Sequence, residues 1–261
     1  MAVALVTGGA GAIGRACAKA LVEEGWRVVL ADLDLAEAEI VAAGLGGAPA
    51  AEAVALDVTD FDAVHAAVDG IGSGQDGLRG LVCAAGGGRN LDLTKGPFIE
   101  TKPAEWDRNI EVHLNGVYNS CHAVLPVLYQ GGGGVIVNIS SGAGIRGGPP
   151  HLRQRFASVY SACKGGVIAL TQSIAQEAGP HGVRANCVAP GRTETRDKTI
   201  EEMERMQREE EAIKPGSGRA SPLGRFGRAA DIADAVAFLM SERANYITGS
   251  CLDLTGGIRL H

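Results

Sequence analysis

The sequence contains few aromatic residues, since Phe, Trp and Tyr together make up 4% of its 261 residues. Its formal net charge is −6, which gives no reason to expect nucleic acid as a partner. No apolar run approaches membrane-spanning length, and no basic segment with a cleavage site precedes the first expected strand. These absences favour a cytoplasmic protein with neither a membrane nor a nucleic-acid partner.

The six cysteines are scattered along the chain without a CxxC pair, which argues against a disulfide framework and against a metal site. We expect them to be small buried apolar residues. Apolar residues make up 46% and charged residues 21%, as in ordinary globular proteins. The length suits one large domain, and no repeat or linker divides it. We therefore predict a single catalytic domain over residues 1–261, with an excursion at approximately 192–222 that serves as a substrate lid.

Short apolar runs alternate with helical runs along the whole chain. Runs that are continuously apolar are typical of strands in a parallel sheet covered by helices on both faces. The sequence therefore predicts an α/β fold, a single-domain Rossmann-like doubly wound parallel sheet. The expected strands cover residues 3–6, 27–31, 53–56, 78–84, 135–139, 183–189 and 251–254, and the expected helices cover 15–24, 35–43, 60–70, 103–128, 158–178 and 230–240.

Three glycines stand between the first expected strand and the first expected helix. Gly9, Gly11 and Gly14 have the GxGxxG spacing of a dinucleotide-binding turn, in the strand–turn–helix context that this motif requires. Glycines let the backbone approach a pyrophosphate, and the helix N-terminus presents free N–H groups to it. A glycine turn with a purely structural role is the alternative.

Asp32 lies at the end of the second expected strand, eighteen residues after Gly14. A carboxylate at this place can accept both ribose hydroxyls of NAD and would repel the 2′-phosphate of NADP, so we predict NAD as the cofactor. Alternatively, Asp32 caps the helix 35–43, a role for which Asp34 is also available.

Tyr160 and Lys164 open the expected helix 158–178 and lie four residues apart, so they share one face of it. A free phenol has a pKa near 10 and is a poor base at neutral pH. A neighbouring ammonium favours the ionised phenol and can tune it for acid or base catalysis. A Lys also follows a Tyr at this spacing by chance, so the pair gains its meaning from the other motifs.

Taken together, these motifs resemble those of the short-chain dehydrogenase/reductase family, in its single-domain branch with the YxxxK active site. The resemblance covers essentially the whole chain. Each motif is weak alone, but all of them occur in the family's order. The matching segments are Thr7-Gly8…Ile13-Gly14, Asp57-Val58, Ala84-Ala85-Gly86, Asn138-Ile139-Ser140-Ser141, Tyr160-x-x-x-Lys164, Asn186-x-x-x-Pro190-Gly191 and Thr248-Gly249…Gly256-Gly257.

The resemblance implies a role for each matching residue. Tyr160 would exchange a proton with the substrate oxygen, Lys164 would hold the nicotinamide ribose and lower the pKa of Tyr160, and Ser141 would hydrogen-bond the reacting oxygen. The family also implies a homo-oligomer, most often a tetramer. The residues expected to bind the cofactor are Gly8, Gly11, Ala12, Ile13, Gly14, Asp32, Asp57 and Val58 (adenine), Cys83, Ala84, Tyr160, Lys164, and Thr193 and Thr195 (carboxamide).

The sequence departs from the family pattern at several positions. Ala12 and Cys83 replace the usual glycine and asparagine. His113 stands where the family has the asparagine of its catalytic tetrad, and it could support a proton relay through its ring or its carbonyl. A surface or core histidine with no such role is the alternative, and the nearby Asn115 could be mistaken for the tetrad residue. Ser141 and Tyr160 are nineteen residues apart, about six more than the family usually shows.

The extra residues fall at 147–157, between the two expected catalytic residues, and this segment is basic. Arg146, Arg153 and Arg155 would give the substrate mouth a positive field that suits an anionic group, although a solvated or subunit-interface loop is equally open. Ile200, Met203 and Met206 have the spacing of an apolar helical seam and would line the lid.

The pattern as a whole predicts an NAD(H)-dependent oxidoreductase that interconverts a secondary alcohol and a ketone, with Tyr160 as the general acid or base and no metal. Two alternatives remain open at this point. One is a nonredox epimerase or dehydratase of the related longer branch, for which the chain lacks a second domain. The other is a catalytically silent NAD-binding regulator, against which the intact Ser141, Tyr160 and Lys164 argue.

Overall fold

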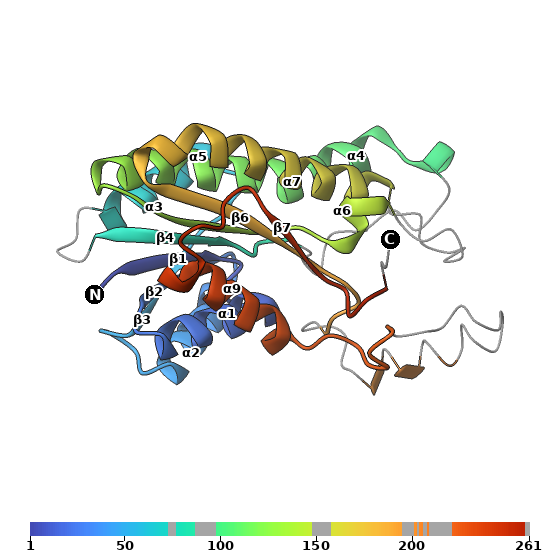
Figure 1. Ribbon diagram of the computed structural model, residues 1–261, viewed down its shortest axis with the longest axis horizontal. Helices are drawn as coiled ribbons and strands as arrows, with labels where there is room; N and C mark the ends of the chain where they lie inside the picture. Colours follow the sequence, from blue (N-terminus) through green and yellow to red (C-terminus); the bar gives the residue numbers. More distant parts are fainter. Residues whose placement is uncertain are drawn as a thin grey trace.

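In the computed structural model, residues 1–72, 77–86, 98–147, 158–194, 201–202, 204–205, 208 and 221–258 are described. Within them, a single seven-stranded sheet runs in the order β3-β2-β1-β4-β5-β6-β7, and every neighbouring pair is parallel (Figure 1). The α/β doubly wound fold is therefore confirmed. The strands are β1 (Val3–Thr7), β2 (Arg27–Asp32), β3 (Ala51–Ala55), β4 (Leu78–Cys83), β5 (Gly134–Ile139), β6 (Val183–Pro190) and β7 (Cys251–Leu254).

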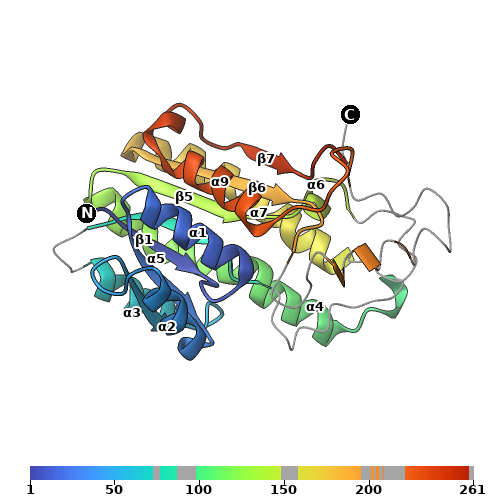
Figure 2. The ribbon, with the colours of Figure 1, turned by 90° about the horizontal axis from the view of Figure 1, so that it is seen from below.

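Helices cover both faces of the sheet (Figures 1 and 2). Helices α3, α5 and α7 pack on one face, and α1, α2 and α9 pack on the other, so the sheet separates two apolar cores. The helices are α1 (Ala12–Glu23), α2 (Leu35–Gly44), α3 (Phe61–Gly72), α4 (Pro103–Ile110), α5 (Gly116–Gln130), α6 (Gly142–Arg146), α7 (Ser158–Ala178) and α9 (Ala229–Met240). Short helical turns are η1 (Phe98–Glu100), η3 (Gly179–His181) and η4 (Glu242–Ala244).

Residue spacing explains why each helix turns one face inward. In α1, the buried residues are Gly14, Cys17, Ala18 and Leu21, three or four positions apart. The same periodicity in α9 buries Ala229, Ile232, Ala233, Val236, Ala237, Leu239 and Met240. Small side chains on both helices suit close packing of helix on helix and helix on sheet.

The long helix expected over 103–128 is interrupted in the structure. Between α4 and α5 lies η2 (Glu111–Asn115), a π-helical segment whose wider turn shifts the side-chain directions. His113 is buried within this segment, at 2% exposure, whereas Asn115 is exposed. Such π-helical turns are frequent at functional sites. The π turn was absent from the sequence prediction because helical periodicity alone does not reveal one extra residue in a turn.

The order of the strands reverses between β1 and β4. β1 pairs with β2 on one side and with β4 on the other. In open α/β sheets, ligands bind beyond the carboxyl ends of the strands at such a switch point. Thr7 and Cys83 are register partners at this edge, and the glycine turn follows Thr7 directly.

Candidate functional site

The glycine turn after β1 comes very close to the end of β4. A Cβ at Gly8, whose φ is +68°, would lie 2.6 Å from the backbone nitrogen of Ala85, so only glycine fits there. A Cβ at Gly14 would collide with the carbonyl oxygen of Gly8, which explains why α1 starts so close to the strand. Gly11, the N-cap of α1, provides no side-chain cap, which leaves first-turn N–H groups available to an anion.

Asp32 is held by the backbone of this turn. Its Oδ2 accepts a hydrogen bond from the N–H of Ala10 at 2.9 Å, and its Oδ1 accepts one from the N–H of Asp34 at 3.0 Å. Asp34, not Asp32, caps α2 through the N–H of Glu37. The capping alternative for Asp32 is therefore wrong, and the carboxylate lies beside the glycine turn.

The residues expected to meet the adenine follow β3, and Ala84, another expected cofactor contact, follows β4. Asp57 Oδ1 accepts hydrogen bonds from the N–H and the hydroxyl of Thr59 in the turn after β3. Val58 is buried, and its carbonyl accepts a hydrogen bond from Asn119. Ala84 donates its N–H to Thr7, which joins the end of β4 to the end of β1.

Ser141 and Tyr160, which are expected to be catalytic, are brought together by the packing of two helices. Ser141 is the N-cap of α6, and its hydroxyl oxygen accepts a hydrogen bond from the N–H of Ala143 at 3.1 Å. A Cβ at Gly144 would lie 2.5 Å from the carbonyl carbon of Lys164, so α6 packs directly on the backbone of α7. This contact brings Ser141 close enough to Tyr160 to lower its pKa.

Lys164 is buried on the same face of α7 as Tyr160. Its exposed fraction is 4%, and its Nζ donates a hydrogen bond to the carbonyl of Ile139 at 2.8 Å. The Nζ lies 5.9 Å from the centroid of the Tyr160 ring. Burial lowers the pKa of Lys164 to about 8, because desolvation disfavours the ammonium.

The pKa of Tyr160 departs from the sequence prediction. The family resemblance implied that Lys164 would lower this pKa, yet in the structure burial raises the pKa of Tyr160 above its ordinary value. The hydrogen bond from Ser141 lowers it in part. Desolvation prevails because the phenol is enclosed, whereas the ammonium of Lys164 is directed to the carbonyl of Ile139. The protein by itself thus holds Tyr160 as a protonated phenol at neutral pH.

His113 lies against Tyr160. Its ring makes an edge contact with Tyr160, with the ring centroids 5.0 Å apart. Among the described residues, neither of its two ring nitrogens has a hydrogen-bond partner. Burial, followed by the charge of Lys164, lowers the pKa of His113 to about 3, so the imidazole is neutral over the physiological range. A Cβ at Gly86 would lie 2.9 Å from Nδ1, so the imidazole packs tightly against the backbone of Gly86, which follows β4.

The structure tests only some of the remaining expectations. Thr193 forms a bridge with Gly227 after β6, and its hydroxyl donates to the carbonyl of Gly191 at 3.3 Å. Arg146 is exposed at the end of α6, five residues from Ser141. Thr195, Arg153 and Arg155 lie outside the described residues, as do Ile200, Met203 and Met206 of the expected lid.

The structure also reveals supporting residues that the sequence did not suggest. Ser140 donates its hydroxyl to the carbonyl of Lys164 at 2.8 Å, and this bond ties the end of β5 to α7. Asn138 donates to the hydroxyl of Thr171, which lies further along α7, at 2.9 Å. The consecutive serines after β5 are the feature of the sequence that signals this arrangement. The hydroxyl of Ser140 binds the backbone of α7, and Ser141 lies beside Tyr160.

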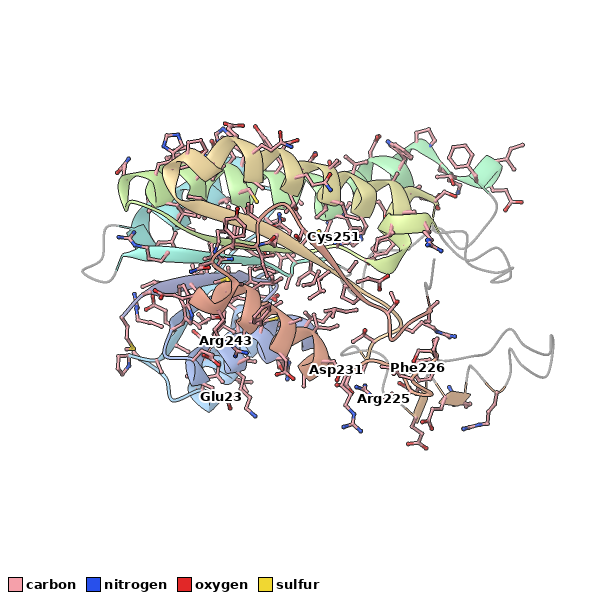
Figure 3. All side chains as sticks on the ribbon, in the orientation of Figure 1. Glu23, Arg225, Phe226, Asp231, Arg243 and Cys251 are labelled. Carbon is pink, nitrogen blue, oxygen red and sulfur yellow. The ribbon has the colours of Figure 1, made fainter. Side chains whose placement is uncertain are left out.

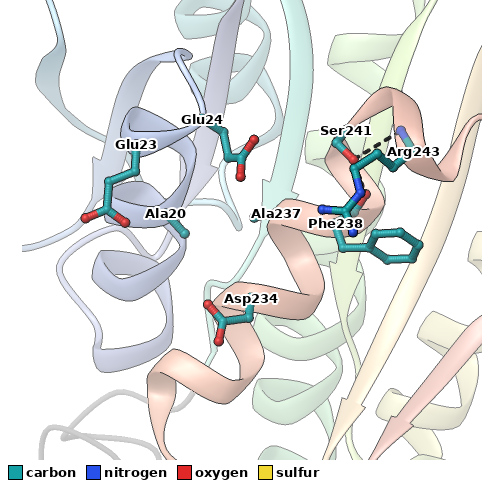
Figure 4. A pocket seen from close by; sticks show the side chains of 8 residues that line it. All are labelled: Ala20, Glu23, Glu24, Asp234, Ala237, Phe238, Ser241 and Arg243. Atoms are coloured by element: carbon teal, nitrogen blue, oxygen red, sulfur yellow. Dashed lines mark hydrogen bonds between the residues drawn. The ribbon is translucent and has the colours of Figure 1, made fainter.

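A surface groove lies elsewhere on the molecule. It is lined by residues at the C-terminal ends of α1 and α9, including Glu23, Glu24, Asp234 and Phe238 (Figure 4). In a doubly wound sheet, the helices run antiparallel to the strands, so their C-terminal ends lie at the amino edge of the sheet. The groove is therefore remote from Tyr160 and takes no part in the candidate site.

The donor set at the carboxyl edge fits a nicotinamide dinucleotide. The glycine turn and the α1 N-terminus suit a pyrophosphate, and the Asp32 carboxylate suits ribose hydroxyls. His113, with its unpartnered nitrogens, and the adjacent Ser141 and Tyr160 supply polar groups that suit a reacting oxygen. No group of three or more metal-ligating side chains occurs among the residues the structure describes. Within that same part of the chain, no helix has the length and apolar character needed to cross a membrane.

Comparison with known proteins agrees with this geometry. A family model described as "Enoyl-(Acyl carrier protein) reductase" matches residues 8–259. The chain is 36% identical to sorbitol dehydrogenase of Cereibacter sphaeroides, over 97% of this chain and 96% of that protein. It is 32% identical to the 3-oxoacyl-[acyl-carrier-protein] reductase FabG of Thermotoga maritima, over 98% of this chain and 97% of that protein.

A third relative and a solved structure extend the comparison. The chain is 35% identical to cis-4-hydroxycyclohexanecarboxylate dehydrogenase of Sinomonas cyclohexanicum, over 98% of this chain and 95% of that protein. A short-chain type dehydrogenase/reductase from Mycobacterium ulcerans superposes with a TM-score of 0.85 at 28% identity, covering 98% of this chain and 89% of that one. The similarity thus extends over nearly the whole chain.

Proposed function

The chain belongs to the short-chain dehydrogenase/reductase family, and from this premise we propose that it interconverts a secondary alcohol and a ketone with NAD(H). Its family membership makes it an oxidoreductase that uses a nicotinamide cofactor. The observation that carries the finer proposal is the proximity of Ser141 and Tyr160, next to the buried Lys164. The relatives support it, because sorbitol, 3-oxoacyl and hydroxycyclohexanecarboxylate are all names of compounds with a hydroxyl or oxo group.

The residues divide the work between orientation and proton transfer. When bound, the nicotinamide supplies or accepts the hydride at the reacting carbon. Ser141 orients the reacting oxygen, and Tyr160 exchanges one proton with that oxygen at its phenol Oη. Because burial raises the pKa of Tyr160, the phenol stays protonated at neutral pH and holds the proton that a ketone oxygen takes up on reduction. Lys164 stabilises the phenolate that remains after donation.

The preference for NAD over NADP rests on Asp32. Its carboxylate is fixed beside the glycine turn by the N–H groups of Ala10 and Asp34, where it can accept from ribose hydroxyls. The following residue is Leu33, so no basic side chain stands there to pair with a 2′-phosphate. Arg15, the nearest guanidinium of α1, forms an ion pair with Glu37 at 2.8 Å and is thereby directed to a carboxylate.

We further propose a substrate with an anionic group a few bonds from the reacting carbon. Arg146 follows Ser141 closely, and Arg153 and Arg155 follow it in the sequence. Arg192 lies just after β6, and its guanidinium is 5.2 Å from the Phe226 ring centroid. The relative named for hydroxycyclohexanecarboxylate supports an acidic substrate class.

The quaternary state proposed for the enzyme is a homotetramer. Support comes from the family and from large apolar side chains on the outer surface of α4 and α5, where Trp106 is 39% and Tyr118 is 45% exposed. Light scattering at micromolar concentration checks this, and a monomeric mass would contradict it.

The decisive experiment is a substrate panel followed by NADH absorbance. It should include neutral and acidic secondary alcohols, the corresponding ketones, and an enoyl thioester as a test of the chemistry that the family model's description names. We expect turnover of secondary alcohols and ketones, with NAD(H) preferred. Reduction of the enoyl thioester alone would replace this proposal with carbon–carbon double-bond reduction, and no turnover at all would favour a silent NAD-binding protein.

A further inference from the structure

Two cysteines face each other across the last pair of strands. Cys187 on β6 and Cys251 on β7 are direct register partners in the parallel pairing. β7 is the edge strand of the sheet, so Cys251 is partly exposed, whereas Cys187 is 1% exposed. Figure 3 labels Cys251 on this strand. Neither cysteine takes part in the proposed reaction.

The register places the Cα atoms of the two cysteines at a spacing that a disulfide can span. Neighbouring strands lie about 4.7–4.9 Å apart, and register partners in a parallel pair point to the same face of the sheet. Disulfides join Cα atoms that are roughly 4.4–6.8 Å apart, so this pair meets the distance requirement without movement of the strands. Each thiol shifts the pKa of the other, as expected for two side chains that lie close together.

The two thiols have opposite acid–base character. The hydrogen bond from Cys187 lowers the pKa of Cys251, because it stabilises a thiolate there. The same bond and burial raise the pKa of Cys187, although a hydrogen bond with Thr171 acts in the other direction. Asp253 on β7 opposes the ionisation of Cys251 in part. The thiol of Cys251 is thus the more reactive and is partly exposed, whereas the thiol of Cys187 is buried on the adjacent strand.

We propose that Cys251 and Cys187 form a reversible disulfide on exposure to hydrogen peroxide, with Cys251 as the reacting thiol and Cys187 as the resolving thiol. The inference is independent of the proposed oxidoreductase reaction. In the first step, the Cys251 thiolate attacks one peroxide oxygen. A sulfur–oxygen bond forms, the oxygen–oxygen bond breaks, and hydroxide leaves, so the sulfur loses two electrons and the peroxide gains them.

In the second step, the Cys187 sulfur attacks the sulfenic sulfur of Cys251. The sulfur–sulfur bond forms, the sulfur–oxygen bond breaks, and the departing oxygen leaves as water with the proton of Cys187. The sum is two thiols and one peroxide giving one disulfide and two waters. A dithiol reductant reverses it.

A second thiol pair in the protein provides an internal contrast. Cys121 lies close enough to Cys83 to raise its pKa, but the two thiols are 2% and 1% exposed. Cys17 is fully buried without a partner thiol, and burial raises its pKa to about 12. Peroxide cannot reach these three buried thiols, so the proposal assigns the reaction to Cys187 and Cys251 on β6 and β7.

The test uses the full-length reduced protein and hydrogen peroxide. After alkylation and trypsin digestion, the peptide 185–192 should be found joined to the peptide 244–259, with the loss of two hydrogen atoms. The joined peptides should disappear after dithiothreitol. The oxidised protein should also melt several degrees higher, because the crosslink closes a long loop. Separate oxidation of Cys251, or preferential crosslinking of Cys83 with Cys121, would overturn the proposal.

Variants separate the two roles and guard against a folding artefact. In Cys187→Ser, the sulfenic acid of Cys251 should persist and be captured by dimedone. In Cys251→Ser, Cys187 should remain reduced under the same peroxide exposure. Cys17→Ser is the matched control and should crosslink like the unmutated protein. A dimedone adduct on Cys187 instead of Cys251 would reverse the assignment, and an absent adduct in Cys187→Ser would refute it.

Discussion

The nucleotide end and the catalytic end of the proposed site differ in how far the protein itself pairs their polar groups. At the nucleotide end, both oxygens of Asp32 accept backbone hydrogen bonds. At the catalytic end, both ring nitrogens of the buried His113 lack a partner among the described residues. An unsatisfied buried polar group costs about 1–3 kcal/mol. The nucleotide end is therefore preformed by short backbone contacts, whereas the catalytic end is completed by what binds there.

The strongest test of the catalytic end is Tyr160→Phe. Loss of the proton-transferring hydroxyl should lower kcat by roughly 10²–10⁴-fold, the usual contribution of general acid–base catalysis. NADH binding, measured by fluorescence titration, should change little, because the phenol hydroxyl is not the main cofactor contact. Turnover close to that of the unmutated enzyme would require another proton donor.

The nucleotide end is tested by Asp32→Asn. Loss of a charge-assisted hydrogen bond to the ribose is worth about 1.5–3 kcal/mol, so kcat/KM with NAD should fall by roughly ten- to a hundredfold. The value with NADP should hold or rise, since the repelling charge is gone. The matched control is Asp34→Asn, at the cap of α2, which should leave the NAD/NADP ratio unchanged. Equal use of both cofactors by the unmutated enzyme would contradict the assignment of Asp32.

The unpartnered imidazole predicts an acid-sensitive stability. The pKa of His113 is about 3 in the folded protein and about 6.5 when unfolded, so between these values the unfolded chain binds the extra proton. The free energy of unfolding should therefore fall as the pH is lowered, by about 2 kcal/mol more between pH 7 and pH 5 than in His113→Asn. Denaturant unfolding of both proteins at both pH values measures this difference. If the free energy of unfolding fell equally in both proteins, His113 would have to be solvated.

Lys164 predicts the same trend on the alkaline side. Its pKa is about 8 when folded against 10.5 when unfolded, so the unfolded chain again binds more protons between these values and stability rises with pH. Without cofactor, the free energy of unfolding should increase by roughly 1.5 kcal/mol from pH 8 to pH 9.5. In Lys164→Gln this increase should be absent. The same rise in the variant would assign it to other groups.

The smallest expected effect concerns the mouth of the catalytic end. Arg146→Ala, Arg153→Ala and Arg155→Ala should each be assayed on an acidic alcohol and on its neutral ester. One arginine in contact with the carboxylate should lower kcat/KM for the acid by about tenfold or more while sparing the ester. Equal modest losses on both substrates would assign the segment to shape or to subunit contact.

The local pattern of apolar and turn-forming residues was sufficient to predict most of the strands and helices. The expected bounds of α7 (Ser158–Ala178) and β7 (Cys251–Leu254) agree with the structure, and the other strands and helices differ mainly at their ends. The glycine turn and the Tyr160–Lys164 spacing were also readable, since each depends on residues close in sequence. The exception is η2 (Glu111–Asn115), because apolar periodicity is almost the same for an α-helix with or without one wider turn.

What the sequence by itself determined is the alternation of strands and helices, the nucleotide-binding turn and the family to which the chain belongs, because these follow from short-range periodicity, glycine stereochemistry and motif order. Only the tertiary structure decided that His113 rather than Asn115 faces Tyr160, that Asp32 binds Ala10, and that Cys187 pairs with Cys251. It also reversed the expected direction of the Tyr160 pKa. The physical reason is that desolvation and strand register depend on segments distant in the chain, which no local pattern records.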